Sequence, residues 1–289
     1  MTATLDEGEW RARQHAHAER IRPWIEPRLE RRRRGERHPV DDFLFEYYSF
    51  RPGQLATWHP GAGIELTGDV REWESVRGYV VRDGRALVDP AEVPIDSLRA
   101  FAHLLRQTTE REPQYGCFGR HEWAMVYRLG QDEVRHSTWP LRVTPAQIAE
   151  VVESSPLKCT HFDAFRFYSP AARPLNVVTP TRATQAELEQ PGCLHATMDL
   201  YKWAFRSYPI VGAELTADCF ALARDVRDVD MRVAPYDLTA LGLEPLPIET
   251  PEGRAEFVRH QRAFAERGAR LRDRVLRVIE SALAIPQPA

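Results

Sequence analysis

The sequence predicts a mainly α (α+β) globular fold, on three observations. Long stretches carry apolar residues at helical spacing, as at Leu98, Phe101 and Leu105. The 22 prolines are scattered among apolar residues, where they mark helix ends and loops rather than disorder. The clearest β signal is Asp83-Gly84 between two short apolar runs, because Asp-Gly supplies the positive φ of a tight turn. We therefore expect a helical globular domain with a small β-hairpin near residues 76–89.

Each expected helix has a start or stop signal that sets its limits. The first, over residues 8–34, is a charged amphipathic helix that Pro23 and Pro27 interrupt. The second begins after Asp41-Asp42, which offers an N-cap, and ends at Arg51-Pro52-Gly53. Further helices are expected over residues 95–112, 116–127, 144–153, 192–207, 212–230 and 250–283.

Length and composition indicate one globular domain with a charged arm. With 289 residues and 43% hydrophobic content, the chain can bury a substantial core. We expect residues 1–37 to form a charged N-terminal helical arm and residues 38–289 a single, mainly helical domain. The N-terminus lacks an apolar leader, and no window approaches the roughly 18 apolar residues of a membrane span, so the expected location is cytoplasmic, with no membrane partner.

Charge and cysteine spacing exclude several classes of protein. The net charge of -3 arises from 39 basic and 42 acidic side chains, so duplex binding would need a local basic patch. The four cysteines lie outside C-x-x-C pairs, which excludes a zinc ribbon and a disulfide framework and predicts buried free thiols. They are Cys117, Cys159, Cys193 and Cys219. The oligomeric state is left open by the sequence.

The motif Thr160-His161-Phe162-Asp163 has two interpretations. With Thr160 as N-cap, Asp163 stands at the third helical position and the pair resembles a capping box. Alternatively, His161 and Asp163 are a catalytic pair, because burial among aromatic side chains shifts pKa values toward catalytic use. Arg166 would then pair with an anionic substrate group or with Asp163 itself.

A second candidate set lies on two successive expected helices. His195 and Asp199 are four residues apart, and Glu214 and Asp218 repeat that spacing on the next helix. Two facing helices of this kind can hold one or two ions of iron, manganese or zinc in a bundle core. The alternative is that His195 hydrogen-bonds to Asp199 and that the other acidic residues are solvated.

Aromatic residues gather between residues 43 and 58, and most of them must be core. One or two of Tyr47, Tyr48 and Trp58 are candidates to wall a base-binding pocket. Asp41 is an active-site candidate because a histidine lies three residues upstream.

A further candidate lies in the loop that follows residue 232. The alternating Asp/Arg character of Asp225–Arg232 is typical of a surface ion-pair ladder. The loop after it carries Pro235-Tyr236-Asp237, which would present Tyr236 rigidly. Tyr236 is therefore a substrate-binding candidate.

Several segments together resemble a known family. They read HPVDDFLFEYY, WHPG, HFDAFRFY, QPGCLH, MDLYKW and DMR followed by PYDL. This set resembles a family of actinobacterial and cyanobacterial proteins commonly labelled 3-methyladenine DNA glycosylase, over most of residues 38–262. The resemblance implies excision of an alkylated base. The chain lacks a helix-hairpin-helix signature of the Leu-Pro-Gly-Val-Gly type, and its mild acidity makes a smaller nucleoside an alternative substrate.

The leading hypothesis is an N-glycosidic hydrolase on a modified purine, in damaged DNA or a smaller nucleoside, without a cofactor. A carboxylate would orient water and stabilise the positive charge that develops on the sugar, while aromatic side chains stack on the base. The candidate catalytic residues are Asp163, His161, Asp199, His195 and Asp41. The candidate substrate-binding residues are Tyr47, Tyr48, Trp58, Arg166, Lys202, Trp203 and Tyr236.

Two alternatives come from other classes. The first is a metal-dependent enzyme of the non-heme iron type, acting on a small molecule and built on a helical bundle. Its ion, iron, manganese or zinc, would be held by His195, Asp199, Glu214 and Asp218, with help from His161. The second is a non-catalytic interaction protein, which predicts that the His/Asp motifs are buried without a cleft.

Overall fold

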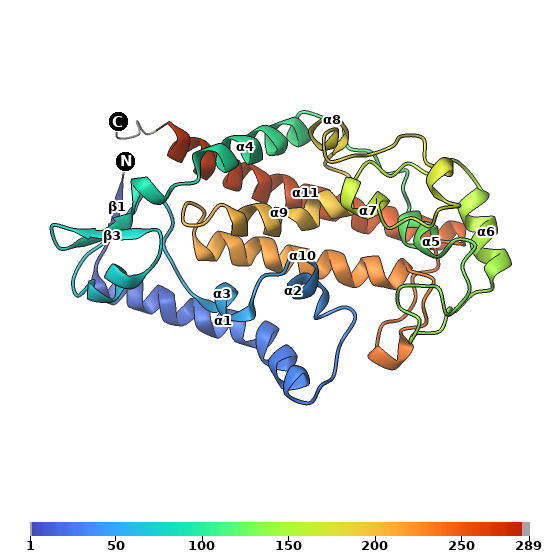
Figure 1. The fold of residues 1–289 in the computed structure, drawn as a ribbon, viewed down its shortest axis with the longest axis horizontal. Helices are drawn as coiled ribbons and strands as arrows, with labels where there is room; N and C mark the ends of the chain where they lie inside the picture. The colour runs from blue at the N-terminus through green and yellow to red at the C-terminus, as the bar shows by residue number, and fades with distance from the viewer. Residues whose placement is uncertain (1, 285–289) are drawn as a thin grey trace. The chain divides into compact units, whose positions relative to one another are not determined.

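The computed structural model describes residues 2–284 and confirms a mainly helical fold with a small sheet (Figure 1). The α-helices of this part of the chain are α1 (Glu7–Arg33), α2 (Phe43–Tyr47), α3 (Pro52–Ala56), α4 (Ile95–Thr109), α5 (Arg120–Val126), α6 (Pro145–Glu153), α7 (Phe162–Phe165), α8 (Gln185–Leu188), α9 (Leu194–Arg206), α10 (Ala213–Val233) and α11 (Pro251–Leu283). The strands are β1 (Ala3–Leu5), β2 (Ile64–Leu66), β3 (Tyr79–Arg82) and β4 (Arg85–Val88). Short 3-10 helices cover Arg71–Ser75, Pro90–Glu92, Arg173–Leu175 and Thr239–Leu241. Of the helices in residues 2–284, none combines the length and the apolar character of a membrane span.

The chain divides into two compact units, and three helices, α9, α10 and α11, supply residues to both. Unit 1 contains the chain up to Leu105, Asp199–Ala223 and the chain from Arg270 onward. Unit 2 contains Arg106–Met198 and Arg224–Ala269. The limit expected at residue 37 falls inside unit 1.

The sheet of unit 1 has the strand order β1-β2-β4-β3. β1 runs parallel to β2, and the other two pairs are antiparallel. β3 and β4 form the expected hairpin, whose turn residues Asp83 and Gly84 have φ values of 49° and 71°. The hairpin near residues 76–89 is thereby confirmed. β1 and β2 were not expected, since each has only three residues and shows no alternating pattern.

A cluster of tryptophans forms the core beside this sheet. Trp10 and Trp58 each meet Trp73 edge to face, with ring centroids 6.2 and 6.0 Å apart. Such pairs add stabilisation beyond the apolar area that they bury. Tyr79 and Leu66 bring the sheet into the same cluster. Trp58, a candidate for base stacking, is thus part of the unit 1 core.

Helix α1 is continuous, so the predicted interruption at Pro23 and Pro27 is wrong. Each proline removes one helical hydrogen bond and leaves the carbonyl four residues earlier without its donor. Both prolines are exposed, and so is Glu19, whose carbonyl is one of the two affected groups. Water can therefore bind these carbonyls, and the helix continues to Arg33.

The segment after α1 corrects two further predictions. The expected helix over residues 43–50 ends at Tyr47, and α3, which was not expected, follows from Pro52. Asp42 stands at the N-cap position of α2 but makes no capping hydrogen bond. Its buried carboxylate instead pairs with Arg31 at 2.7 Å and Arg28 at 3.2 Å. A charge-assisted pair with two guanidinium groups outweighs one capping bond.

His59 in unit 1 gives a testable dependence of stability on pH. Burial, with a smaller contribution from His17, lowers the pKa of His59 to about 3, against the opposing charge of Glu214. Above pH ~6.5 His59 is neutral in both states and adds no pH dependence. As the pH falls below that value, only the unfolded state gains the proton, so the free energy of unfolding drops by about 2 kcal/mol by pH ~5. Urea unfolding of wild type and His59→Gln measures this slope.

His260, which is only partly buried, supplies the control for that experiment. Its replacement, His260→Gln, is expected to keep the wild-type slope between pH ~5 and ~7, whereas His59→Gln reduces it. An identical slope in wild type and His59→Gln would contradict the prediction.

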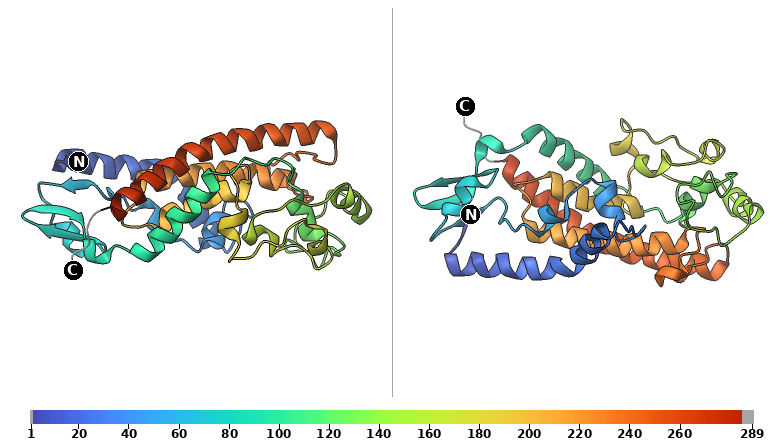
Figure 2. Two further views of the ribbon diagram at one scale, coloured as in Figure 1. Left: turned by 90° about the horizontal axis from the view of Figure 1, so that it is seen from above. Right: turned by 60° about the horizontal axis from the view of Figure 1, so that its bottom comes forward.

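Unit 2 consists of short helices and loops packed around segments of α9, α10 and α11. Figure 2 shows α5 and α6 lying next to each other, in green, in both views. α6 begins where expected, because Thr144 and Gln147 form a capping box. α5 starts at Arg120 rather than near residue 116. The reason is Gly119, which has a φ of 73° and ends the preceding turn.

Candidate metal centre

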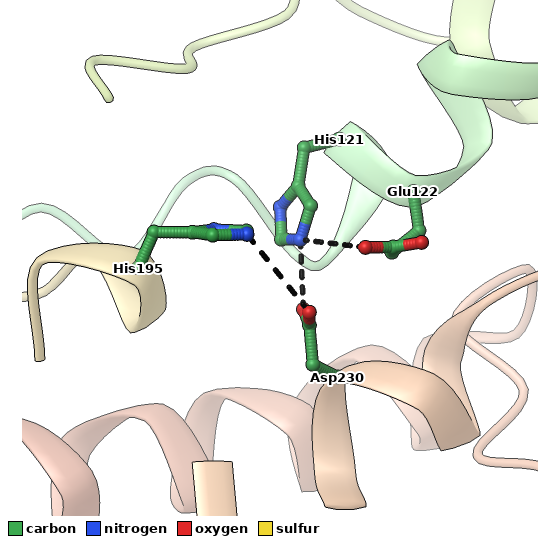
Figure 3. Close-up of side chains that lie close together, drawn as sticks. All are labelled: His121, Glu122, His195 and Asp230. Carbon is green, nitrogen blue, oxygen red and sulfur yellow. Dashed lines mark hydrogen bonds and ion pairs between the residues drawn. The ribbon is translucent and has the colours of Figure 1, made fainter. Parts of the chain in front are cut away.

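Four buried side chains from three helices of unit 2 converge on one point (Figure 3). His121 and Glu122 come from α5, His195 from the first turn of α9, and Asp230 from α10. Each is at most 7% exposed. One ligand atom from each lies within 4.8 Å of the corresponding atoms of the other three. Two imidazoles and two carboxylates this close form a possible metal site.

Close packing of α5 against the end of α10 sets the position of His121 and Glu122. A Cβ atom on Gly119 would lie only 2.7 Å from Cγ2 of Val233. The indole Nε1 of Trp123 donates to the Val233 carbonyl at 2.7 Å. α5 therefore approaches α10 closely enough for its first turn to face Asp230.

The contact at Gly119 makes a testable prediction. Gly119→Ala adds a methyl group at a positive φ and against Val233, so we expect a loss of about 2 kcal/mol of stability together with loss of metal. Gly242 is the matched control, because its φ is 75° and a Cβ added there would have nothing within 4 Å. Gly242→Ala should cost about 1 kcal/mol, for backbone strain alone. Equal losses in the two variants, measured by chemical unfolding, would contradict this account.

His195 is positioned by the turn that precedes α9. The side-chain oxygen of Gln190 accepts hydrogen bonds from the backbone N–H groups of Gln114 at 2.8 Å and Gly192 at 2.7 Å. Gln261 donates from Nε2 to the Gly192 carbonyl at 2.6 Å. These contacts fix the start of α9, and with it the imidazole of His195.

Asp230 lies on the buried face of α10, so the predicted surface ion-pair ladder is wrong at this residue. Its neighbours in helical spacing, Val226 and Val233, are buried, and Asp230 itself is 0% exposed. Its carboxylate accepts from Nε2 of His121 at 2.7 Å and pairs with Arg227 at 3.2 Å. Burial of this charge is possible because two cationic or donor groups contact it.

Two of the distances within the group match the edges of a coordination polyhedron. Nε2 of His121 lies 3.9 Å from Oε1 of Glu122, and Nε2 of His195 lies 4.0 Å from Oδ2 of Asp230. Nitrogen and oxygen ligands at ~2.1 Å from an ion stand roughly 3 to 4.2 Å from one another. The distance of 2.7 Å between Nε2 of His121 and Oδ1 of Asp230 is shorter than such an edge, so these two side chains would have to move apart to hold one ion with the others.

The pKa values of three of these groups depend on one another. Burial, with the nearby carboxylate of Asp230, raises the pKa of Glu122 to about 7. Burial alone would lower the pKa of His121, but Asp230 and Cys117 together outweigh it, through charge and hydrogen bonds, and hold that pKa well above its usual value. Burial would raise the pKa of Asp230, and His121 more than compensates, so the pKa falls below its usual value. An ion at this site would therefore take the place of protons on His121 and Glu122, beside the charges of Asp230 and Arg227.

Cys117 contacts the other nitrogen of His121, with Sγ 3.3 Å from Nδ1. Burial raises the pKa of this thiol, but His121 beside it has the larger combined effect and lowers the pKa below its usual value. A partner on Nδ1 fixes the imidazole so that Nε2 faces Asp230, which is how histidine ligands of metals are oriented.

A pocket of about 230 Å³ opens beside the centre, with His121 and His195 in its wall. Cys117, Cys159 and Cys193 also line it, although they are far apart in the sequence. All four cysteines of the chain are free thiols, as expected. The pocket gives a small molecule direct access to the two imidazoles.

The structure places His161 next to this centre, beside His195. Its ring stacks on that of His195, with centroids 5.3 Å apart. The predicted capping box with Thr160 as N-cap is wrong, because His161 is itself the N-cap of α7 and its Nδ1 accepts from the backbone N–H of Ala164 at 3.3 Å. Asp163, the leading catalytic candidate, pairs with Arg166 at 3.2 Å.

Other sequence candidates form a separate cluster in unit 1. The hydroxyl of Tyr48 donates to Asp199 at 2.6 Å, and Lys202 pairs with the same carboxylate at 2.9 Å. The Lys202 ammonium also lies over the ring of Trp203, 4.4 Å from its centroid. Tyr47 stacks on the ring of Phe43, at the start of α2.

The remaining candidates make contacts of other kinds. Asp41 pairs with Arg31 at 3.4 Å on the surface of unit 1. Tyr236 packs edge-on against His136 in unit 2, with ring centroids 5.5 Å apart.

Of the metal set expected from sequence, only His195 belongs to the group of four. Glu214 pairs with Arg13, and Asp218 pairs with Arg20 and Arg274, each at 2.8 Å. Both acidic residues lie in unit 1. Asp199 belongs to the Tyr48 and Lys202 cluster.

Sequence reasoning missed His121, Glu122 and Asp230. The signal for Asp230 was its helical register with apolar residues at 226, 229 and 233, which places it on the buried face of α10. For His121 the signal was a histidine and a glutamate side by side within an apolar segment, where a buried charged pair needs partners.

Comparisons with protein-family models, with curated proteins and with solved structures found no match to this chain.

Proposed function

We propose that this chain is a metal-dependent enzyme acting on a small molecule, with its ion held by His121, Glu122, His195 and Asp230. One observation carries the proposal. Two imidazoles and two carboxylates, all buried and from three helices, lie within 4.8 Å of one another. Mixed imidazole and carboxylate ligands suit divalent iron, manganese or zinc.

The surroundings of the four residues support the same proposal. The carboxylates of Glu122 and Asp230 are out of water, and Arg227 is the cationic side chain that contacts both, at 3.8 and 3.2 Å. A divalent ion would take the place of the protons on His121 and Glu122 and act on a substrate as a Lewis acid. His121 and His195 face the pocket, so a substrate would approach from that side.

The test is elemental analysis of protein purified without chelator. We expect about one equivalent of iron, manganese or zinc in the wild type and less than about a tenth of an equivalent in His195→Ala. Asp218→Asn, in the acidic set expected from the sequence, should keep the wild-type content. Wild-type protein with less than about a tenth of an equivalent, even after supplementation with each ion, would contradict the proposal.

N-glycosidic hydrolysis of a modified purine, which the sequence resemblance implies, stays a prediction with its own assay. Wild-type protein is expected to release 3-methyladenine from alkylated DNA or from the nucleoside, and Asp163→Asn to abolish release. Release that Asp163→Asn does not reduce would exclude Asp163 as the catalytic carboxylate. Release that persists after chelator treatment would separate this activity from the metal centre.

A further inference from the structure

We propose that the pocket beside the metal centre binds a small monocarboxylate that also carries a hydrogen-bond donor. The inference rests on the proposed function, which places the ion at His121 and His195 in the wall of the pocket. It adds the class of substrate. It is carried by two polar groups in the wall, Gln261 and Lys158, and by what lies between them.

Gln261 offers the pocket a buried acceptor. Its side chain is 2% exposed, and Nε2 donates to the Gly192 carbonyl at 2.6 Å, which fixes the orientation of the amide. Within residues 2–284, Oε1 of this amide accepts no hydrogen bond. Buried acceptors are nearly always paired, and leaving one unpaired is unfavourable. A ligand with an O–H or N–H group would supply the partner that Oε1 lacks.

Lys158 offers the pocket a positive charge. In the part of the chain that the structure describes, its ammonium makes no ion pair. The stem of the side chain lies over the backbone at Gly116, where an added Cβ would stand 3.3 Å from Cδ of Lys158. The Lys158 side chain is exposed, and glycine at position 116 lets its stem lie along the edge of the pocket.

The composition of the wall selects a carboxylate over a phosphate. The described residues that line the pocket include no arginine, and Lys158 is a single point charge. A dianionic phosphate is usually held by several backbone or guanidinium donors. The wall also carries Gln114, Thr160 and Gln190. Its apolar part consists of Leu194, Phe257 and three thiols, against which the body of the ligand would pack. At about 230 Å³ the pocket is smaller than common drug-sized sites of roughly 300 Å³ or more.

Matched probes separate the two contacts. Calorimetry would measure binding of 3-hydroxybenzoate and 4-hydroxybenzoate, which have both groups, of benzoate, which lacks the donor, and of the two hydroxybenzamides, which lack the charge. We expect at least one hydroxybenzoate to bind the wild type about tenfold more tightly than benzoate and than its own amide. Lys158→Met should abolish the difference between acid and amide, and Lys158→Arg should restore it. Gln261→Leu should abolish only the difference between hydroxybenzoate and benzoate.

Controls keep the outcomes distinct. Arg99→Met removes an exposed charge in unit 1 and should leave every affinity unchanged. If Gln261→Leu does not fold, Gln261→Met replaces it, because it removes the same acceptor with a side chain of similar length and should likewise abolish the difference between hydroxybenzoate and benzoate. Neither hydroxybenzoate binding at concentrations up to about 10 mM, or equal affinities for acid, amide and benzoate, would overturn the proposal.

The same titrations on chelator-treated protein distinguish this inference from the metal proposal. The Lys158 and Gln261 pattern in a protein that takes up no iron, manganese or zinc would support the ligand class and reject the metal centre. Full metal content in wild type and Lys158→Met, without that pattern, would support the metal centre and reject the ligand class.

Discussion

Asp230→Asn is expected to empty the metal centre and to destabilise the protein by about 3 kcal/mol or more. The carboxylate is fully buried, 2.7 Å from Nε2 of His121 and 3.2 Å from Arg227. Replacement by an amide removes the charge that compensates Arg227 in the interior, and breaking one partner of a buried ion pair leaves the other uncompensated. Urea unfolding and elemental analysis of the same preparation measure both effects.

Two further variants make this prediction specific. Asp218→Asn breaks ion pairs with Arg20 and Arg274 at a side chain that is 28% exposed, so its cost should stay below about 1 kcal/mol and its metal content should match the wild type. Glu122→Gln should lose metal with a smaller loss of stability, since the pKa of Glu122 is near 7 and its uncharged form is already accessible. Wild-type metal content and stability in Asp230→Asn would refute the assignment.

The helices of this fold could be predicted where a long stretch of apolar residues at helical spacing ends at a residue that terminates helices. α4, α6, α10 and α11 lie close to their expected limits, because each pattern ends at a proline, a glycine or a polar cap. The three-residue strands β1 and β2 could not be predicted, since their pairing is non-local and depends on the tryptophan core. The continuity of α1 through Pro23 and Pro27 depends on exposure of those prolines, which only the tertiary structure determines.

Capping residues show why local motifs were unreliable for the site. Asp42 and Thr160 both fit an N-cap signature, yet Asp42 binds two arginines and the cap of α7 is His161. A carboxylate or hydroxyl at a helix start is available to any partner that the fold brings near. Where a guanidinium group arrives, the charged pair prevails over the cap.

Only part of the candidate centre could be predicted from the sequence, because its carboxylates come from other parts of the chain. His195 and His161 were singled out, and the structure stacks their rings. Their carboxylate neighbours in sequence, Asp199 and Asp163, have other partners, while Asp230 approaches His121 across 109 positions of sequence. Spacing of four on one helix identifies residues that share a face, but it does not identify which other helix supplies the remaining ligands.

Metal removal gives the second large effect. An ion that binds only the folded chain stabilises it by about 4 kcal/mol when its free concentration is roughly 1000 times Kd. Chelator-treated wild type should therefore unfold at lower urea concentration than the same protein resupplied with its ion, and His195→Ala should show no such difference. Glu214→Gln, in unit 1, is the control that should respond like the wild type.

The location of this stabilisation is as informative as its size. The ion would join α5, α9 and α10 within unit 2, so hydrogen exchange of the amides in α5 should slow on metal addition. The hairpin of β3 and β4 lies in unit 1 and serves as the internal reference. Uniform slowing in both segments would point to binding elsewhere or to a global effect. No change in α5 with iron, manganese or zinc would leave His121, Glu122, His195 and Asp230 as a buried ion-pair group, whose stability comes from Arg227 and the imidazoles alone.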